Sequence, residues 1–309
     1  MLQINGLNEG LEIFKALGSE PRMRIVELLS EKGEMSLNEI ASALGLTGGA
    51  ITSHVRKLEE CGIVRITQVH TSRGLKKNCS LCEAQILLNV VPSSEEHNTK
   101  VYETEVPIGH YSDYSIRPGC GLAGTSAMIG PTDDPRCFAW PERVDADLLW
   151  FHDGYIEYRI PNLLPEGHRI TQVTLSFEIS SAEQNLPEDT LSDIYFSLNG
   201  KPLGHWLTIP HTDQARGIYT PLWWNRPQRQ HGYLKMIVVN EMGVFLDGVK
   251  LEETGIGWEF LDENGEMKLR FACHPENGRE GGIALYGSRF GNYQQNIHAR
   301  VHYMPEVTK

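Results

Sequence analysis

Helix-spaced apolar residues mark the stretch from Met35 to Ile66. They recur every three or four positions, at Leu37, Ile40, Ala41 and Leu44 and again at Ile51, Val55 and Leu58. Gly45 separates the two runs, and Cys61-Gly62 follows the second, where a left-handed glycine ends many helices. Thr47 is suited to begin the second run, because its hydroxyl can accept a free backbone N–H. We predict two short helices joined by a tight turn, a helix-turn-helix.

The outward positions of the second predicted helix carry small hydrogen-bond donors, an imidazole and two cations. They are Thr47, Ser53, His54, Arg56 and Lys57. A helix that reads a major groove needs such side chains for base edges and phosphates. Acidic residues follow only at Glu59 and Glu60, at the far end. An ordinary helical hairpin with a solvated polar face gives a similar pattern, so these two helices alone leave that alternative open.

The residues after the second helix predict a β-hairpin. Ile63, Val64 and Ile66 form an apolar, strand-like run, the polar segment 68–77 follows, and Cys79 to Leu81 begins a second strand. A hairpin with a basic tip directly after a groove-reading helix is typical of a wing. We expect its cations to reach flanking phosphates or the minor groove; they are Arg73, Lys76 and Lys77.

Together these elements resemble the winged-helix domain of ArsR-type transcriptional regulators, from about Leu7 to Leu88. The matching segments are LEIFKALGSEPRMRIVELL, LNEIASALGLTGGAITSHVRKLEECGIV and RGLKKNCSL. The resemblance covers somewhat over a quarter of the chain and implies a dimeric module that binds a specific double-stranded DNA operator. It does not identify what the protein senses.

Members of that family often dimerise through terminal helices. The predicted helix from Leu7 to Leu17 is a candidate for this role, although its apolar face, formed by Leu7, Leu11, Phe14 and Leu17, could equally belong to the core. Metal-sensing members carry Cys, His or Asp ligands, but the segment from Ser36 to Leu44 contains none of these residues. No C-terminal helix of the usual kind is evident after Cys82. We therefore expect no metal site and no cofactor.

Cys79 and Cys82 form a CxxC sequence without a second pair elsewhere in the chain. A structural zinc site needs four ligands, and residues three apart on a strand point to opposite faces. We expect these thiols to be buried or to belong to the wing strand. A redox sensor that uses Cys61, Cys79 or Cys82 stays open as an alternative function.

The formal net charge of -12 is unevenly distributed. Residues 1–90 contain ten Lys/Arg and ten Glu, so the other 219 residues hold 18 of the 28 basic and 30 of the 40 acidic side chains. DNA would repel this acidic part, which we expect to project away from it. The sequence has no apolar run of membrane-spanning length and no signal-peptide pattern at its start, so we expect a cytoplasmic protein.

The hydrophobic period changes to two beyond a hinge-like stretch that starts at Pro92. We predict a winged helix at residues 1–91, a linker at 92–99 and an all-β sandwich or jelly-roll-like domain at 100–309. The chain as a whole is then a multidomain α+β protein. Residues 83–91 either continue the wing sheet or form a short helix. Hairpin signals stand between alternating runs, at His152-Asp153-Gly154, Asn199-Gly200 and Asp247-Gly248.

The alternating pattern fades between Pro118 and Arg143, where glycine and proline are frequent. Irregular segments of this length are often functional. Its PGCGLAG sequence has the glycine spacing of a phosphate loop, but neither a βαβ pattern nor a GK[ST] ending accompanies it.

Aromatic and polar residues of the β-rich part suggest a ligand, because sugar rings stack on aromatic faces and their hydroxyls need polar partners. The candidates are Trp206, Arg216, Trp223, Trp224, Trp258, Asn292 and Gln294. Of the adjacent pair Trp223-Trp224, at most one can line a site. The domain weakly resembles carbohydrate-binding β-sandwiches in architecture. With no GxSxG, HExxH or Walker sequence present, we predict a non-enzymatic regulator whose sandwich senses a small molecule such as a sugar, or alternatively only dimerises.

Overall fold

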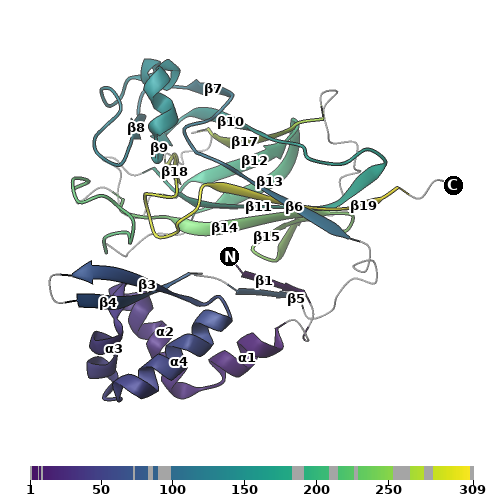
Figure 1. Ribbon diagram of the computed structural model, residues 1–309. Coiled ribbons are helices and arrows are strands. Elements are labelled where there is room, and N and C mark those ends of the chain that lie inside the picture. The colour runs from purple at the N-terminus through teal and green to yellow at the C-terminus, as the bar shows by residue number, and fades with distance from the viewer. Residues whose placement is uncertain are drawn as a thin grey trace. The chain divides into compact units, whose positions relative to one another are not determined.

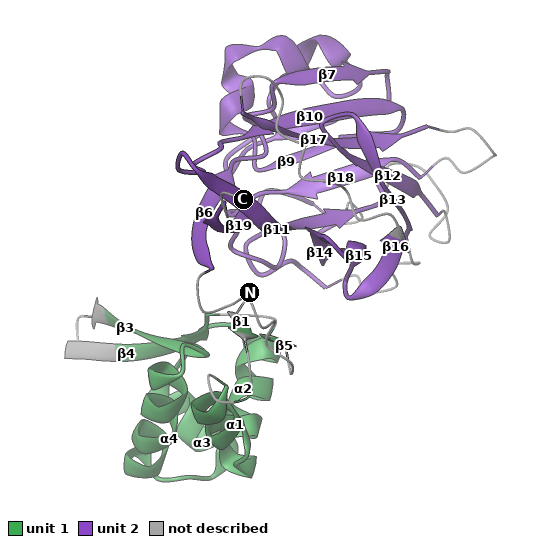
Figure 2. Cartoon of the chain, turned by 90° about the vertical axis from the view of Figure 1, so that its right-hand side faces the viewer, with its two compact units in different colours: residues 1–97 green, residues 98–309 purple. Residues whose placement is uncertain are grey.

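The computed structural model divides the chain into two compact units, Met1–His97 and Asn98–Lys309 (Figures 1 and 2). The structure describes residues 2–5, 7, 10–71, 74–82, 86–89, 99–182, 191–208, 215–225, 229–252, 265–274 and 281–306. Each unit has its own hydrophobic core.

The first unit combines four helices with a β-hairpin. Its elements are β1 (Leu2–Asn5), α1 (Leu11–Leu17), α2 (Glu20–Lys32), β2 (Met35–Ser36), α3 (Leu37–Leu44), α4 (Gly48–Glu60), β3 (Val64–Thr71), β4 (Gly74–Leu81) and β5 (Ile86–Asn89). The strands β3 and β4 pair antiparallel, and β2 adds a short third strand beside β4. Figure 1 shows this hairpin beside α3 and α4. The arrangement is the winged helix-turn-helix that the sequence predicts.

Local capping fixes where the two helices of the motif begin and end. Ser36 and Glu39 form a reciprocal capping box at the start of α3, and Gly45 ends α3 in the left-handed conformation at φ 66°. Thr47 caps α4 by accepting the Ala50 N–H at 3.3 Å. Gly62 follows α4 at φ 72°. The predicted turn, cap and stop of the motif are therefore all observed.

Two features at the ends of the first unit differ from the expectation. The helix expected from Leu7 begins only at Leu11. The segment left open as strand or helix forms β5, which leaves the wing sheet and pairs with β1 in a separate parallel pair (Figure 1). The apolar spacing of the sequence did not predict β1.

The second unit is built from antiparallel strands with two short 3-10 helices. These elements are β6 (Lys100–Val106), β7 (Asp113–Ile116), β8 (Gly121–Ala123), η2 (Pro135–Ala139), η3 (Pro141–Asp145), β9 (Leu148–Phe151), β10 (Gly154–Ile160), β11 (His168–Ser180), β12 (Asp193–Leu198), β13 (Lys201–Leu207), β14 (Tyr233–Asn240), β15 (Gly243–Leu246), β16 (Val249–Glu252), β17 (Met267–Cys273), β18 (Ile283–Tyr286) and β19 (Ile297–Pro305). One sheet has the order β13-β12-β17-β10-β7. The other runs β16-β15-β14-β11-β18-β9-β8, with β19 also beside β11 and β6 beside β19.

The main core of the second unit lies between these two sheets. Phe177 from the larger sheet meets Phe196 and Phe271 from the smaller one, with ring centroids 5.8 Å and 4.8 Å apart. Contacts between sheets of this kind define a β-sandwich. The predicted fold class is thus confirmed.

The larger sheet also buries part of its opposite face. There Trp150, Trp224, Tyr286 and Phe290 form a second aromatic cluster, which we call the outer cluster. Strand β11 is consequently buried on both sides near its end, and it carries the fully buried carboxylate of Glu178 on this face.

The predicted turns are observed in part. Asn199-Gly200 joins β12 to β13 and Asp247-Gly248 joins β15 to β16, each with both residues at positive φ, as hairpins of this length require. His152-Asp153-Gly154 instead connects β9 to β10, which lie in different sheets. It is therefore a crossing between sheets and not a hairpin.

Candidate nucleic-acid interface

Helix α4 turns its apolar residues inward and its polar residues outward. Ile51, Val55 and Leu58 are completely buried against the other helices. The side chains on the remaining positions are exposed at Thr47, Thr52, Ser53, Arg56, Lys57, Glu59 and Glu60, while His54 is half-buried. The structure therefore brings the predicted groove-facing residues onto one exposed helix surface, with His54 at its margin.

Few contacts restrain these exposed side chains. Arg56 pairs with Glu60 one turn later at 3.0 Å, and both side chains are largely exposed. Such solvent-exposed pairs contribute little stability, so a phosphate can replace the glutamate without a large penalty. The Thr52 hydroxyl donates to the Gly48 carbonyl at 2.8 Å, which turns it back onto its own helix.

The electrostatics of α4 favour an anion near its beginning. The first turn of this helix, which is described in full, contains no acidic residue. A helix N-terminus carries a partial positive charge from its aligned peptide dipoles, and the two glycines at Gly48 and Gly49 leave its backbone exposed. The N-terminal end of α4 is therefore the end that favours an approaching anion.

The wing supplies further basic side chains. Lys77 of β4 is exposed and pairs in register with exposed Gln68 of β3. Arg65 of β3 is also exposed, and the sequence analysis missed it although strand alternation beside buried Val64 indicates an outward position. Arg73 lies outside the described residues, and the backbone alone is described at Lys76.

Comparison with known families bears directly on this interface. Residues 19–65 match the family model described as winged helix-turn-helix DNA-binding. These residues form a winged helix-turn-helix domain. The match spans α2, α3, α4 and the start of β3, so it contains the helix with the exposed polar surface.

Several solved structures are similar to part of the chain. A transcriptional regulator homologue from Pyrococcus horikoshii OT3 is 28% identical over 22% of this chain and 66% of its own, with a TM-score of 0.21. The homodimeric winged helix-turn-helix domain of a possible ArsR-family regulator from Mycobacterium bovis is 23% identical over 25% of this chain and 67% of its own, with a TM-score of 0.23. Reduced HlyU from Vibrio cholerae is 24% identical over 24% and 73%, with a TM-score of 0.21. No curated protein matches the chain.

The first unit contains all three cysteines considered for redox sensing, and Cys82 is half-buried just after β4. Burial raises the pKa of the Cys79 thiol to about 12, with the negative charge of Glu59 adding to the effect. Burial likewise raises the pKa of Cys61, whose thiol donates to the Glu12 carbonyl at 3.4 Å. Reactive cysteines require a lowered pKa, so both thiols have the properties of structural residues.

In the sandwich, two of the four tryptophans proposed as ligand contacts are core residues. Trp206 is 8% exposed and belongs to the core between the sheets. Trp224 is 3% exposed within the outer cluster, and its indole N–H donates to the Arg229 carbonyl at 3.0 Å. Neither offers an open ring to a ligand. Trp223 is half-buried and donates its indole N–H to the Thr125 carbonyl at 2.7 Å, while Trp258 lies outside the described residues.

The polar candidates of the sandwich hold loops in place. Arg216 donates to the carbonyls of Thr220, Pro221, Leu222 and Trp224, at 2.6–3.5 Å. The side-chain oxygen of Asn292 accepts a hydrogen bond from the Ile218 backbone N–H, and the Asn292 backbone N–H donates to the carboxylate of Glu178. Gln294 is exposed. Except for Gln294, these side chains are engaged in contacts within the protein.

Glu178 is the centre of this loop arrangement, and sequence reasoning did not single it out. Its carboxylate accepts backbone N–H groups from Gly232, Asn292 and Tyr293 at 2.7–3.0 Å. Burial raises the pKa of Glu178 to about 7, although these hydrogen bonds lower it. The signal was weak because one carboxylate at an alternating position of a predicted strand looks like any solvated residue.

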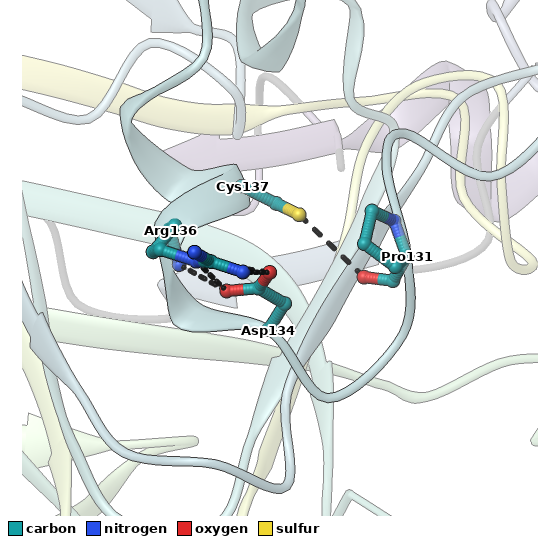
Figure 3. A network of polar contacts seen from close by, with 4 residues as sticks. All are labelled: Pro131, Asp134, Arg136 and Cys137. Atoms are coloured by element: carbon teal, nitrogen blue, oxygen red, sulfur yellow. Dashed lines mark hydrogen bonds and ion pairs between the residues drawn. The ribbon is translucent and has the colours of Figure 1, made fainter.

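The irregular segment 118–143 is likewise held by its own contacts. Asp134 accepts the Arg136 backbone N–H at 3.0 Å and pairs with its guanidinium at 2.7 Å, while the Cys137 thiol donates to the Pro131 carbonyl at 3.5 Å (Figure 3). Buried Phe138 anchors η2 in the core between the sheets. The segment thus contains β8, η2 and η3. Its observed contacts are those of a segment packed against the core between the sheets.

The described part of the chain shows neither a cluster of metal ligands nor a membrane-spanning helix. Its residues contain no group of three or more His, Cys, Asp or Glu side chains placed to hold a metal ion. Within the same ranges, no helix is long and apolar enough to span a membrane.

Proposed function

We propose that the protein is a DNA-binding transcriptional regulator whose α4 enters the major groove. The exposed polar surface of α4, within a part of the chain that matches winged helix-turn-helix DNA-binding proteins, is the observation that carries this proposal. Ser53, Arg56 and Lys57 are the side chains we assign to bases and phosphates, with Thr47 at the helix start. Lys77, and with it Arg73 and Lys76, would contact flanking phosphates from the wing.

The regulator acts as a homodimer in this proposal. Leu7, Leu11 and Phe14 are 54%, 48% and 39% exposed, whereas the neighbouring Ile13 and Ala16 fill the core. Leu17, the fourth residue of the predicted apolar face, packs against the core. The exposure of the other three in the single chain supports the dimer interpretation for those residues. A symmetric pair of such domains reads an inverted repeat with half-site centres about 10 base pairs apart.

The sandwich serves as the sensor or as a further dimerisation domain. We propose that it senses an uncharged small molecule, and a sugar is the first class to test. Among the candidate ligand contacts that the structure describes, Gln294 is exposed, and Arg216, Trp223 and Asn292 are half-buried. The acidic surplus of this unit favours a neutral ligand over an anion and fits a domain that lies away from the DNA. A regulator of this kind works in the cytoplasm and has no catalytic step.

The redox alternative receives less support. The raised pKa values of Cys61 and Cys79 leave little thiolate at neutral pH. If peroxide nevertheless abolished DNA binding and a reductant restored it, the cysteine-based function would replace ligand sensing.

Selection from a pool of random duplexes tests the DNA-binding proposal. The full-length protein should enrich an inverted repeat, and footprinting should show two protected half-sites about one duplex turn apart. Failure to enrich any sequence, by a protein that is folded, would overturn it. Thermal-shift measurements of the same protein with mono- and oligosaccharides test the sensor, because a ligand of the folded state raises the melting temperature with its concentration.

A further inference from the structure

The β1–β5 pair joins two distant ends of the winged-helix unit. Its register is parallel, with Leu2 opposite Ile86, Gln3 opposite Leu87 and Ile4 opposite Leu88. From Asn89 the chain continues through residues 90–97 to the unit that begins at Asn98. From Asn5 it leads through Gly10 into α1. The last described strand before the sandwich is therefore hydrogen-bonded to the strand that precedes α1.

Side-chain contacts continue from this pair toward α4. Ile4 is 1% exposed in the core of the unit, and Leu88 packs against the same core. The backbone of Gly10 lies so close to Ile4 and Phe14 that a methyl group there would meet their side chains at 3.1 and 2.8 Å. The Glu12 carbonyl of α1 then accepts the thiol of Cys61, the residue that ends α4. An unbroken series of contacts thus links β5, β1, α1 and the end of the recognition helix.

The pair is of a kind that opens easily. Parallel pairing is slightly weaker per residue than antiparallel pairing, and a two-stranded sheet of this size is marginal by itself. Each strand has four residues. Local elements of this size can open at less than the global unfolding free energy, so a modest difference in ligand affinity can shift their population.

We infer that the β1–β5 pair is the coupling element through which the state of the sandwich reaches the DNA-binding helix. This inference rests on the proposed function. In the closed state β1 holds α1 against the end of α4, and the helices are fixed in the arrangement that binds DNA. A ligand that favours one state of the sandwich changes the closed fraction, and the DNA affinity changes with it.

The test opens the pair and then closes it covalently in the full-length protein. Ile4→Asn should open the pair by placing a polar group in the core. Gln3→Cys and Leu87→Cys, added to Ile4→Asn, allow a disulfide to form across two positions in register, since adjacent strands lie about 5 Å apart. The matched control carries Ile4→Asn with Gln3→Ser and Leu87→Ser and receives the same oxidant, so that effects on the native cysteines are subtracted.

Affinity is measured for the duplex that the unmodified protein selects from a random pool. We expect Ile4→Asn to weaken binding at least about fivefold, the lower end of ordinary coupling between sites. Oxidation of the dicysteine variant should restore most of this loss, whereas the serine control should stay weak. Unchanged affinity in Ile4→Asn, or a loss that the disulfide does not restore, would overturn the inference.

Hydrogen exchange gives a second readout that needs no DNA. Opening of the pair should speed amide exchange from Glu12 to Leu17 and at the end of α4, and the disulfide should slow it again. If the unmodified protein selected no duplex, the proposed function would fail. The exchange pattern would still show whether opening of the β1–β5 pair is coupled to α1 and to the end of α4. Exchange in α1 and α4 that ignores the state of the pair would contradict the inference.

Discussion

Helix α4 and the sandwich segment Ala215–Asn225 were both expected to offer side chains to a partner, and they differ in where those side chains point. In α4 the polar residues lie on the surface because the apolar positions at helical spacing fix the inward face. In the segment, Arg216 bonds to four backbone carbonyls and Trp224 fills a core. Periodicity determines the direction of a side chain, whereas a loop rich in aromatic and polar residues can fold onto itself.

The same difference separates the buried network of the sandwich from the exposed pair on α4. The carboxylate of Glu178 accepts hydrogen bonds that hold Gly232 and the turn at Asn292 against the large sheet. The exposed pair of Arg56 and Glu60 joins two positions of a single helix. Residues of the first kind should affect stability, and residues of the second kind should affect DNA binding.

The largest effect on stability should come from Trp224. Trp224→Ala removes a ring that is 3% exposed in the outer cluster, and such substitutions cost about 3–5 kcal/mol. Trp223→Ala, at a half-buried position one residue away, should cost about half as much or less. Denaturant unfolding of the two variants measures the difference. Equal losses of stability in the two variants would mean that burial of Trp224 in the outer cluster contributes no more than the half-buried ring of Trp223.

A pH-dependent effect should come from Glu178. Its pKa is about 7 in the folded protein against the ordinary 4.5. The native state therefore holds a proton that the unfolded state has released, and the free energy of unfolding falls as the pH rises from 4.5 through 7. The loss can reach about 3 kcal/mol, because each pKa unit corresponds to about 1.4 kcal/mol.

The comparison of wild type with Glu178→Gln isolates this effect. His302 works in the opposite direction, because burial lowers its pKa to about 4 and so makes the native state less stable as the pH falls below 6.5. The two residues partly cancel in the wild-type profile. The difference between wild type and Glu178→Gln should nevertheless decline with rising pH. A difference that is flat from pH 4.5 to 8 would contradict the raised pKa of Glu178.

The smallest effect should come from the cap of α4. Thr47→Ala removes the acceptor of the Ala50 N–H and should cost about 1 kcal/mol, while Thr47→Ser should keep most of the stability. A denaturant titration that monitors unfolding of the winged-helix unit measures the stability of both variants. A destabilisation by serine equal to that by alanine would indicate a role for the Thr47 methyl group and not for the cap.

The sequence predicted the parts of the fold in which local chemistry is decisive. The cap at Thr47, the stop at Gly45 and the hairpin at Asn199-Gly200 follow from properties of single residues. Strand β5 was beyond such reasoning, because its partner β1 lies more than eighty positions earlier in the chain. Pairing over that distance depends on the tertiary fold, which apolar spacing does not encode.

The candidate DNA interface was more predictable than the ligand site for the same reason. Buried Val55 fixes the face on which Arg56 and Lys57 lie, so their exposure follows from the helical period. No period governs residues 215–225, and which tryptophan is buried there depends on the distant Trp150 and Phe290. Sequence reasoning stated that at most one of Trp223 and Trp224 can line a site, but it could not say which.

The salt dependence of DNA binding by the α4 variants tests the central claim most directly. The affinity of wild type, of Arg56→Ala/Lys57→Ala and of Lys250→Ala for the selected duplex is measured from low to physiological salt. Lys250→Ala removes an exposed cation from β16 of the sandwich and serves as the control. The double variant should bind more weakly, and its slope of log affinity against log salt should be shallower by about 0.9 for each phosphate that it no longer neutralises. Lys250→Ala should match wild type. If the double variant kept the wild-type affinity and slope, α4 would not be the recognition helix.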